Sequence, residues 1–173
     1  RFVNFMSNPD AKPAIEQFGS WDKYLCVATM LATMPGLPMF AHGQIEGYHE
    51  KYGMEYLTPR WQEEVDQQLV DGPLQQIFPP LRRRALFRGA ENFQLYDFIS
   101  EYGVEEHIYA YSNQLGSVHV LILCNNSAHQ ISGRIGPAVV RADGKQQSVR
   151  LACELDDSGD YLLACALGQP QQY

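Results

Sequence analysis

The chain has 173 residues, 45% of them hydrophobic, which suits one large domain or two small ones with a buried core. Its formal net charge of -7 argues against a nucleic-acid partner, because the phosphate backbone requires a basic protein surface. The one basic cluster, Arg82-Arg83-Arg84, is expected on the solvated side of a helix. No window of about 18 apolar residues predicts a membrane span, no secretory signal is visible, and we expect a cytoplasmic protein.

The N-terminal part has the pattern of a strand, a helix and a second strand. Phe2–Met6 is a short apolar run that ends at the turn Asn8-Pro9. Apolar residues then recur every three or four positions over 20–34, which predicts a helix, and Pro35-Gly36 ends it. A second apolar run follows at 37–41. This spacing predicts a βαβ unit with parallel strands that are buried on both faces.

The middle of the chain contains a long loop, "GQIEGYHEKYGMEYLTPR", which is rich in Gly, Tyr and charge. Its length exceeds that of a simple connection, so it is a candidate functional loop. Residues 61–70 and 74–87 are predicted to form two helices, and Pro79-Pro80 should break or kink the second.

The pattern changes near Gly89, after which short apolar runs alternate with turn residues. "ADGK" at 142–145, for example, is typical of a hairpin turn. This spacing predicts an antiparallel sandwich or open barrel. We therefore divide the chain into an α/β part, residues 1–88, and an all-β antiparallel sandwich domain, residues 89–173.

Two strands alone do not make the first part a domain, because a parallel pair leaves two unpaired edges and bare apolar faces. A (β/α)8 barrel closes such edges, and we interpret residues 1–88 as its last two βα units. The chain begins at Arg1 inside an apolar run, which indicates the cut end of a longer polypeptide. In such a barrel the chemistry lies where the strands end. Asp10 follows the first predicted strand, and His42, Gln44 and Glu46 follow the second.

The motifs "FVNFMSNPD" and "MPGLPMFAHGQIEGYHEKYGMEY" resemble the end of the catalytic barrel in the α-amylase superfamily of glycoside hydrolases. The first matches the motif after the seventh strand, and the second resembles the eighth-strand pattern through Gly36, Pro38, Gly43 and Glu46. "LFRGAENFQLYDFISEYGVEEHIYAYSNQLGSVHVLILCNN" resembles the transition from barrel to sheet in large bacterial members. The resemblance covers roughly residues 1–135. The fold that it implies is an α/β barrel fragment followed by a β-domain.

The resemblance implies a hydrolase or transglycosylase that acts on α-glucans such as starch, glycogen or maltooligosaccharides by a retaining mechanism. The nucleophile Asp and the acid/base Glu would lie upstream, in the remainder of the barrel. Asp10 would stabilise the transition state, and Pro9 stands where the family usually has a sugar-binding His. Substrate contacts would come from Asn8, His42, Gln44 and Glu46. The fragment alone is expected to be inactive, and no cofactor is expected.

Each of these assignments has a structural alternative. Asp10 could be an ordinary turn residue, and Glu46 could be a structural acid that pairs with a base or a backbone N–H. His42 could line a sugar site or cap its strand. The aromatic residues of the long loop could stack on sugar rings or pack the loop. His42 and His49 with their neighbouring acids lack the helical HExxH geometry, so we expect no metal site.

A different class of function stays open for the β-rich part. Residues Phe93, Tyr96, Tyr109 and Tyr111 could expose aromatic rings on one face of the sheet. Such a face would make the fragment a non-catalytic β-module that binds carbohydrate or packs on a partner domain. We favour the alternative, in which these rings pack in the core or between domains.

Overall fold

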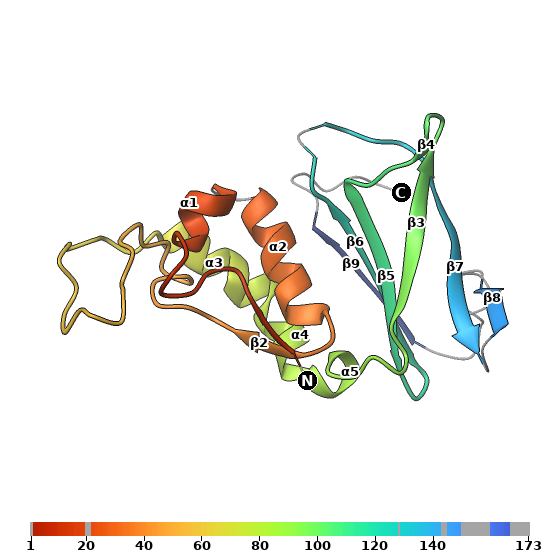
Figure 1. Ribbon diagram of the computed structural model, residues 1–173, viewed down its shortest axis with the longest axis horizontal. Coiled ribbons are helices and arrows are strands. Elements are labelled where there is room, and N and C mark those ends of the chain that lie inside the picture. The colour runs from red at the N-terminus through yellow and green to blue at the C-terminus, as the bar shows by residue number, and fades with distance from the viewer. Residues whose placement is uncertain (1, 20–21, 128, 143–144, 150–159, 167–173) are drawn as a thin grey trace. The chain divides into compact units, whose positions relative to one another are not determined.

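The computed structural model describes residues 2–19, 22–127, 129–142, 145–149 and 160–166. The chain divides into two compact units, of which the first ends at Arg84 and the second begins at Ala85 (Figure 1). The sequence analysis places the boundary a few residues later, between 88 and 89.

The first unit begins with the expected βαβ unit. Strand β1 (Val3–Phe5) is followed by helices α1 (Ala14–Phe18) and α2 (Asp22–Thr33) and then by strand β2 (Leu37–Met39). The two strands pair in parallel, which confirms the predicted unit. Both strands are shorter than their apolar runs, and α1 was not predicted. Ser20 and Trp21, at the predicted start of the second helix, lie outside the described residues.

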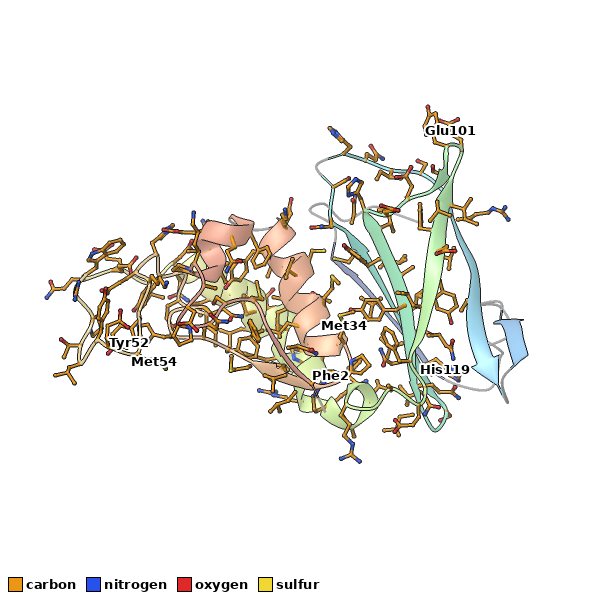
Figure 2. The ribbon with its side chains drawn as sticks, viewed as in Figure 1. Phe2, Met34, Tyr52, Met54, Glu101 and His119 are labelled. Carbon is orange, nitrogen blue, oxygen red and sulfur yellow. The ribbon has the colours of Figure 1, made fainter. Side chains whose placement is uncertain are left out.

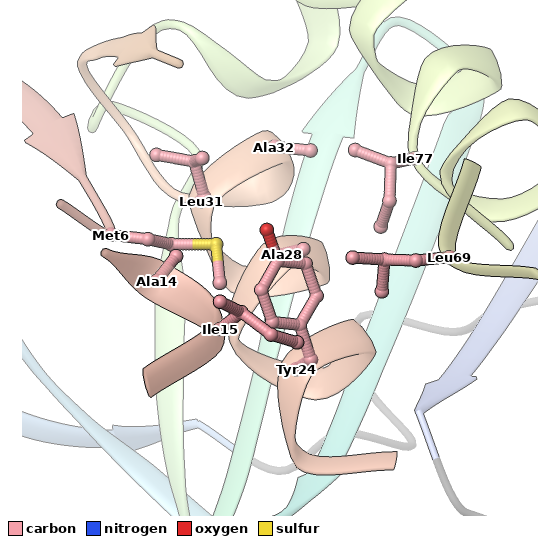
Figure 3. Close-up of a cluster of buried hydrophobic side chains, with 9 residues drawn as sticks. All are labelled: Met6, Ala14, Ile15, Tyr24, Ala28, Leu31, Ala32, Leu69 and Ile77. Atoms are coloured by element: carbon pink, nitrogen blue, oxygen red, sulfur yellow. The ribbon is translucent and has the colours of Figure 1, made fainter. Parts of the chain in front are cut away.

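The core of this unit lies between α2 and the helix that follows the long loop (Figure 3). Tyr24, Ala28 and Leu31 recur at three- and four-residue intervals, which places them on one face of α2. Leu69, from that later helix, is 1% exposed. The burial of one such side chain stabilises the fold by about 1.5–3 kcal/mol. The cluster consists of Met6, Ala14, Ile15, Tyr24, Ala28, Leu31, Ala32, Leu69 and Ile77.

One face of the two-stranded sheet is exposed, and the residues on its other face, Asn4 and Pro38, are half-buried. Val3 pairs with Leu37 and Phe5 with Met39, so these four apolar side chains lie side by side on the same face. They are 51%, 62%, 49% and 37% exposed respectively, and the predicted burial on both faces is therefore wrong for the chain as described. Within the described residues, no third strand pairs with β1 or β2. The sheet thus presents an apolar surface and two open edges.

The helix after the long loop begins later than predicted. Helix α3 (Gln67–Gln76) has Asp66 as its N-cap, whose side chain accepts a hydrogen bond from the Leu69 backbone N–H at 3.1 Å. The predicted helix over 61–70 is therefore wrong for residues 61–66. The backbone N–H of Trp61 bonds instead to a carboxylate of the long loop.

The predicted interruption at Pro79-Pro80 is confirmed. Helix α4 (Phe78–Arg82) holds both prolines in its first turn, where a helix does not need their missing N–H groups, and α5 (Arg84–Phe87) follows separately.

Arg84 departs from the predicted solvated position. Its guanidinium donates to the carbonyls of Ala32 and Met34 at 2.7 and 2.9 Å and also to that of Gly36. The last carbonyls of α2 have no partner inside the helix, so Arg84 satisfies groups that would otherwise stay unpaired. Burial lowers the pKa of this guanidinium from its ordinary value.

The second unit is a β-sheet in which all but one of the strand pairs are antiparallel (Figure 1). Its strand order is β8-β7-β3-β5-β6-β9, with β4 beside β3. The pair formed by β6 and β9 is parallel, and the expectation of an entirely antiparallel arrangement is wrong there. All described strands of the second unit belong to one sheet, and no second packed sheet is seen among them. The strands are β3 (Gln94–Ser100), β4 (Gly103–Val104), β5 (Ile108–Leu115), β6 (Val118–Asn125), β7 (Arg134–Ala142), β8 (Lys145–Val149) and β9 (Asp160–Ala166).

The proposed aromatic binding face of this sheet does not form. Leu95 pairs with Tyr111 and Tyr96 with Ala110, so the two tyrosines point to opposite faces. Both are buried, at 3% exposure for Tyr96 and 0% for Tyr111. Tyr96 and Tyr111 therefore do not share one exposed face, and both are packed in the interior, as the favoured interpretation of these rings predicts.

None of the helices in the described part of the chain combines the length and apolar character needed to cross a membrane.

Candidate active site

A pocket of about 370 Å³ opens at the carboxyl ends of β1 and β2. Three segments line it. The first follows β1 and includes Ser7 and Pro9, the second follows β2 and includes Phe40 and His42, and the third is the stretch of the long loop with Lys51 and Tyr52. Parallel strands end at the same edge of their sheet, so the fold brings together two segments that lie about thirty residues apart in the chain.

Asp10 lies at the rim of this pocket but is not itself one of the lining residues. It is exposed, and its neighbours Pro9 and Ala11 both line the pocket. Across the described residues, its carboxylate has no hydrogen bond and no ion pair, while its backbone N–H and C=O are both bonded. The carboxylate is therefore open to a ligand.

Asn8 holds the turn that carries Asp10. Its side-chain oxygen accepts hydrogen bonds from the backbone N–H groups of Asp10 and Ala11 at 2.9 and 2.8 Å. This is the Asx-turn geometry that the structural alternative assigned to Asp10 itself. Because Asn8 has that role, the turn does not require the Asp10 carboxylate. Asn8 also lines the pocket, and its role as a substrate contact stays a prediction.

His42 lies in a row of aromatic rings along the pocket. Its ring centroid is 4.6 Å from that of Tyr52, and the Tyr52 centroid is 6.0 Å from that of Tyr56. The guanidinium carbon of Arg60 lies 3.9 Å from the Tyr56 ring centroid, which is cation–π geometry. Figure 2 shows Tyr52 and Met54 on the long loop. His42, Tyr52 and Tyr56 all line the pocket. The same aromatic residues therefore pack against one another within the loop and form one wall of the pocket.

The position of His42 depends on the glycine that follows it. Gly43 has φ of +69°, and a Cβ added there would lie 2.6 Å from the Cβ of Tyr48. Only a residue without a side chain combines this left-handed conformation with so close an approach. The chain can therefore turn sharply after His42 and return to the protein interior at Gln44.

Gln44 is placed in the interior rather than in the pocket. It is 4% exposed, its side-chain oxygen accepts from the Ala41 backbone N–H at 3.1 Å, and its side-chain nitrogen lies 3.3 Å from the sulfur of Met6. Its backbone carbonyl accepts a hydrogen bond from the Tyr24 hydroxyl. Gln44 thus ties the turn after β2 to the core, which is a different role from the predicted substrate contact.

Glu46 lies near Tyr24 and does not line the pocket. Burial raises the pKa of the Tyr24 hydroxyl, and the negative charge of Glu46 raises it further. The backbone carbonyl of Glu46 accepts from the Asp66 N–H at 3.0 Å, just before α3. Glu46 therefore lies outside the pocket lining, and among the described residues no hydrogen bond or ion pair of its carboxylate supports the structural alternative.

Two carboxylates hold the long loop: Glu50, which the sequence suggested only as an acid beside a possible metal site, and Glu63, which it did not single out. Glu50 is 7% exposed and accepts hydrogen bonds from the backbone N–H groups of Arg60 and Trp61 at distances between 2.8 and 3.1 Å. The Glu63 carboxylate accepts from the N–H groups of His49 and Glu50 at 2.6 and 2.8 Å. The loop is therefore anchored at two points by charge-assisted hydrogen bonds. In the sequence, the only indication of this role is an acidic residue inside or next to a long loop. Such a residue does not by itself identify the backbone N–H groups to which it will bond.

In the part of the chain that the structure describes, no group of three or more His, Cys, Asp or Glu side chains is arranged to hold a metal ion. The site consists instead of one open carboxylate, one imidazole, two tyrosine rings and one ammonium group around a mostly apolar pocket. Such a set can bind a neutral ligand through stacking and hydrogen bonds, and it can stabilise positive charge at the rim.

Comparison with protein-family models, with curated proteins and with solved structures finds no match to this chain. The resemblance to the α-amylase superfamily therefore depends on the motifs of the sequence alone.

Proposed function

We propose that this chain is the C-terminal portion of a glycoside hydrolase or transglycosylase of the α-amylase type, acting on α-glucans by a retaining mechanism. The single observation that carries the proposal is the exposed Asp10 carboxylate, whose neighbours Pro9 and Ala11 line a pocket at the carboxyl ends of two parallel strands. In a (β/α)8 barrel this edge carries the catalytic groups.

The exposed face of the β1–β2 sheet supports the barrel part of this proposal. Val3, Phe5, Leu37 and Met39 form an apolar surface opposite the face that packs on α2, and both outer strand edges are open among the described residues. In a (β/α)8 barrel, helices cover the outside of the sheet and apolar side chains fill the inside. The remaining strands of the barrel would cover this surface and pair with both edges.

The aromatic rings of the pocket support a carbohydrate ligand. A sugar ring presents C–H groups on its faces and hydroxyl groups at its edge, so it suits a wall of flat rings with a few polar groups. Tyr52 and Tyr56 provide the rings, and His42 and Asn8 provide polar groups in the same lining.

Asp10 would then act on the transition state. Retaining glycosidases use a nucleophile and an acid/base, roughly 5 Å apart, around an oxocarbenium-like transition state. A third carboxylate near the sugar ring stabilises this positive charge more strongly than the neutral ground state, and it therefore accelerates the reaction. The nucleophile and the acid/base would belong to upstream strands, and residues 1–173 alone would be inactive.

The proposal is tested in the full-length polypeptide by the substitution Asp10→Asn, with starch and maltooligosaccharides as substrates. We expect kcat to fall by at least about 100-fold, because removal of one transition-state charge contact typically costs two to three orders of magnitude. Asp22→Asn, an exposed aspartate in the first turn of α2, is the matched control and should keep its activity. An Asp10→Asn protein with unchanged turnover, or a full-length protein inactive on α-glucans, would refute the proposal.

A further inference from the structure

Asp10 has one contact that its own turn does not provide. The side chain of Asn8 binds the two N–H groups of the turn but leaves the carbonyl of Asp10 without a local partner. That carbonyl accepts a hydrogen bond from the ammonium group of Lys51 at 2.8 Å, across 41 positions of sequence. Lys51 also lines the pocket, so this hydrogen bond joins the turn after β1 to the long loop at the pocket itself.

The long loop is anchored immediately beside Lys51. The preceding residue, Glu50, is held through its backbone N–H by the Glu63 carboxylate at 2.8 Å and through its own carboxylate by the N–H groups of Arg60 and Trp61. A lysine on a freely moving loop could not restrain a distant turn, because its long side chain would follow the loop. Here the neighbouring residue, Glu50, is held through both its backbone N–H and its side chain. The ammonium group of Lys51 therefore extends from an anchored segment of the loop.

We propose that Lys51 is a positioning residue that holds the Asp10 turn against the anchored long loop and so keeps the Asp10 carboxylate at the rim of the pocket. The catalytic consequence of this role rests on the proposed function, whereas the structural contact does not. A carboxylate that stabilises a transition state must be held in place before the reaction, since small displacements of catalytic groups lower rates strongly. Asn8 fixes the shape of the turn, and Lys51 fixes its position relative to the pocket wall.

The test compares Lys51→Met and Lys51→Arg in the full-length polypeptide. Methionine keeps most of the apolar stem and removes the ammonium group, and arginine restores a cation that can donate to the same carbonyl. Amide hydrogen exchange of Asp10 and Ala11 reports the turn directly. We expect Lys51→Met to accelerate this exchange about two- to tenfold, the range expected for the loss of one hydrogen bond, and Lys51→Arg to restore most of the protection. Lys23→Met, an exposed lysine of α2, is the matched control.

The second readout is the turnover of maltooligosaccharides. Loss of positioning should lower kcat in Lys51→Met while KM changes little, because substrate contacts elsewhere in the pocket stay intact. Equal exchange at Asp10 and Ala11 in wild type and Lys51→Met would overturn the inference even if Asp10→Asn abolished activity. Faster exchange together with a fully active Asp10→Asn protein would support the contact made by Lys51 and refute the proposed function. The two proposals can therefore fail separately.

Discussion

The carboxylate of Glu50 should determine whether the long loop keeps its structure. The substitution Glu50→Gln preserves the shape of the side chain but removes its charge and one acceptor oxygen. In the wild type the two carboxylate oxygens bind the N–H groups of Arg60 and Trp61 at 2.8 to 3.1 Å, and the side chain is only 7% exposed. Water therefore cannot easily replace a lost partner.

The expected magnitude follows from these contacts. A hydrogen bond to a charged group contributes about 1.5–3 kcal/mol, and Glu50→Gln removes about one of them. At about 1.4 kcal/mol for each factor of ten, local opening of the loop should become roughly 10- to 160-fold more frequent. The global free energy of unfolding should change much less, because the core of the first unit lies around α2 rather than in the loop.

Amide hydrogen exchange at Arg60 and Trp61 measures this opening. Both amides should exchange faster by the factor given above in Glu50→Gln, while amides of α2 should keep their rates. Glu64→Gln is the matched control, because Glu64 is an exposed acid of the same loop. Unchanged exchange at Arg60 and Trp61 would refute the assignment of Glu50 as the anchor of the loop.

Two further predictions concern the stability of the first unit. Leu69→Ala should lower the free energy of unfolding, measured by urea titration, by about 2–5 kcal/mol, because the side chain is only 1% exposed and its removal leaves a cavity. Leu74→Ala, on the same helix but 51% exposed, should have a far smaller effect. Similar losses of stability for both variants would contradict the assigned core. Burial raises the pKa of Tyr24 above its ordinary value of 10.0, so the folded chain keeps a proton that the unfolded chain loses. The free energy of unfolding should therefore fall by about 1.4 kcal/mol per pH unit as the pH rises above 10. The Tyr24→Phe protein should lack this contribution to the pH dependence of stability. Parallel plots of stability against pH for the two proteins would show that Tyr24 ionises normally.

Elements whose signals are local could be predicted from the residues alone. A helical period between two short apolar runs was sufficient to predict a parallel βαβ unit, and the pairing of Val3 with Leu37 confirms it. The same reasoning placed Asn8, Asp10, His42, Gln44 and Glu46 at one edge, because parallel strands of a βαβ unit end on the same side, and of these Asn8 and His42 line the pocket. Pro79-Pro80 marked a helix boundary because the missing N–H groups are a property of the residues themselves.

Roles that depend on partners distant in the sequence could not be predicted in this way. Gln44 and His42 lie two positions apart, yet one is buried in the core and the other lines the pocket. From the sequence, three charged residues of the polar loop have no assigned partner: Glu50, Lys51 and Glu63. The structure shows that they bond to Arg60, Asp10 and His49 respectively. The physical reason is that a hydrogen bond depends on where two groups meet in space. The local pattern of residues predicts which segments form helices and strands. It does not predict which backbone N–H group of a loop will form a hydrogen bond with which side chain.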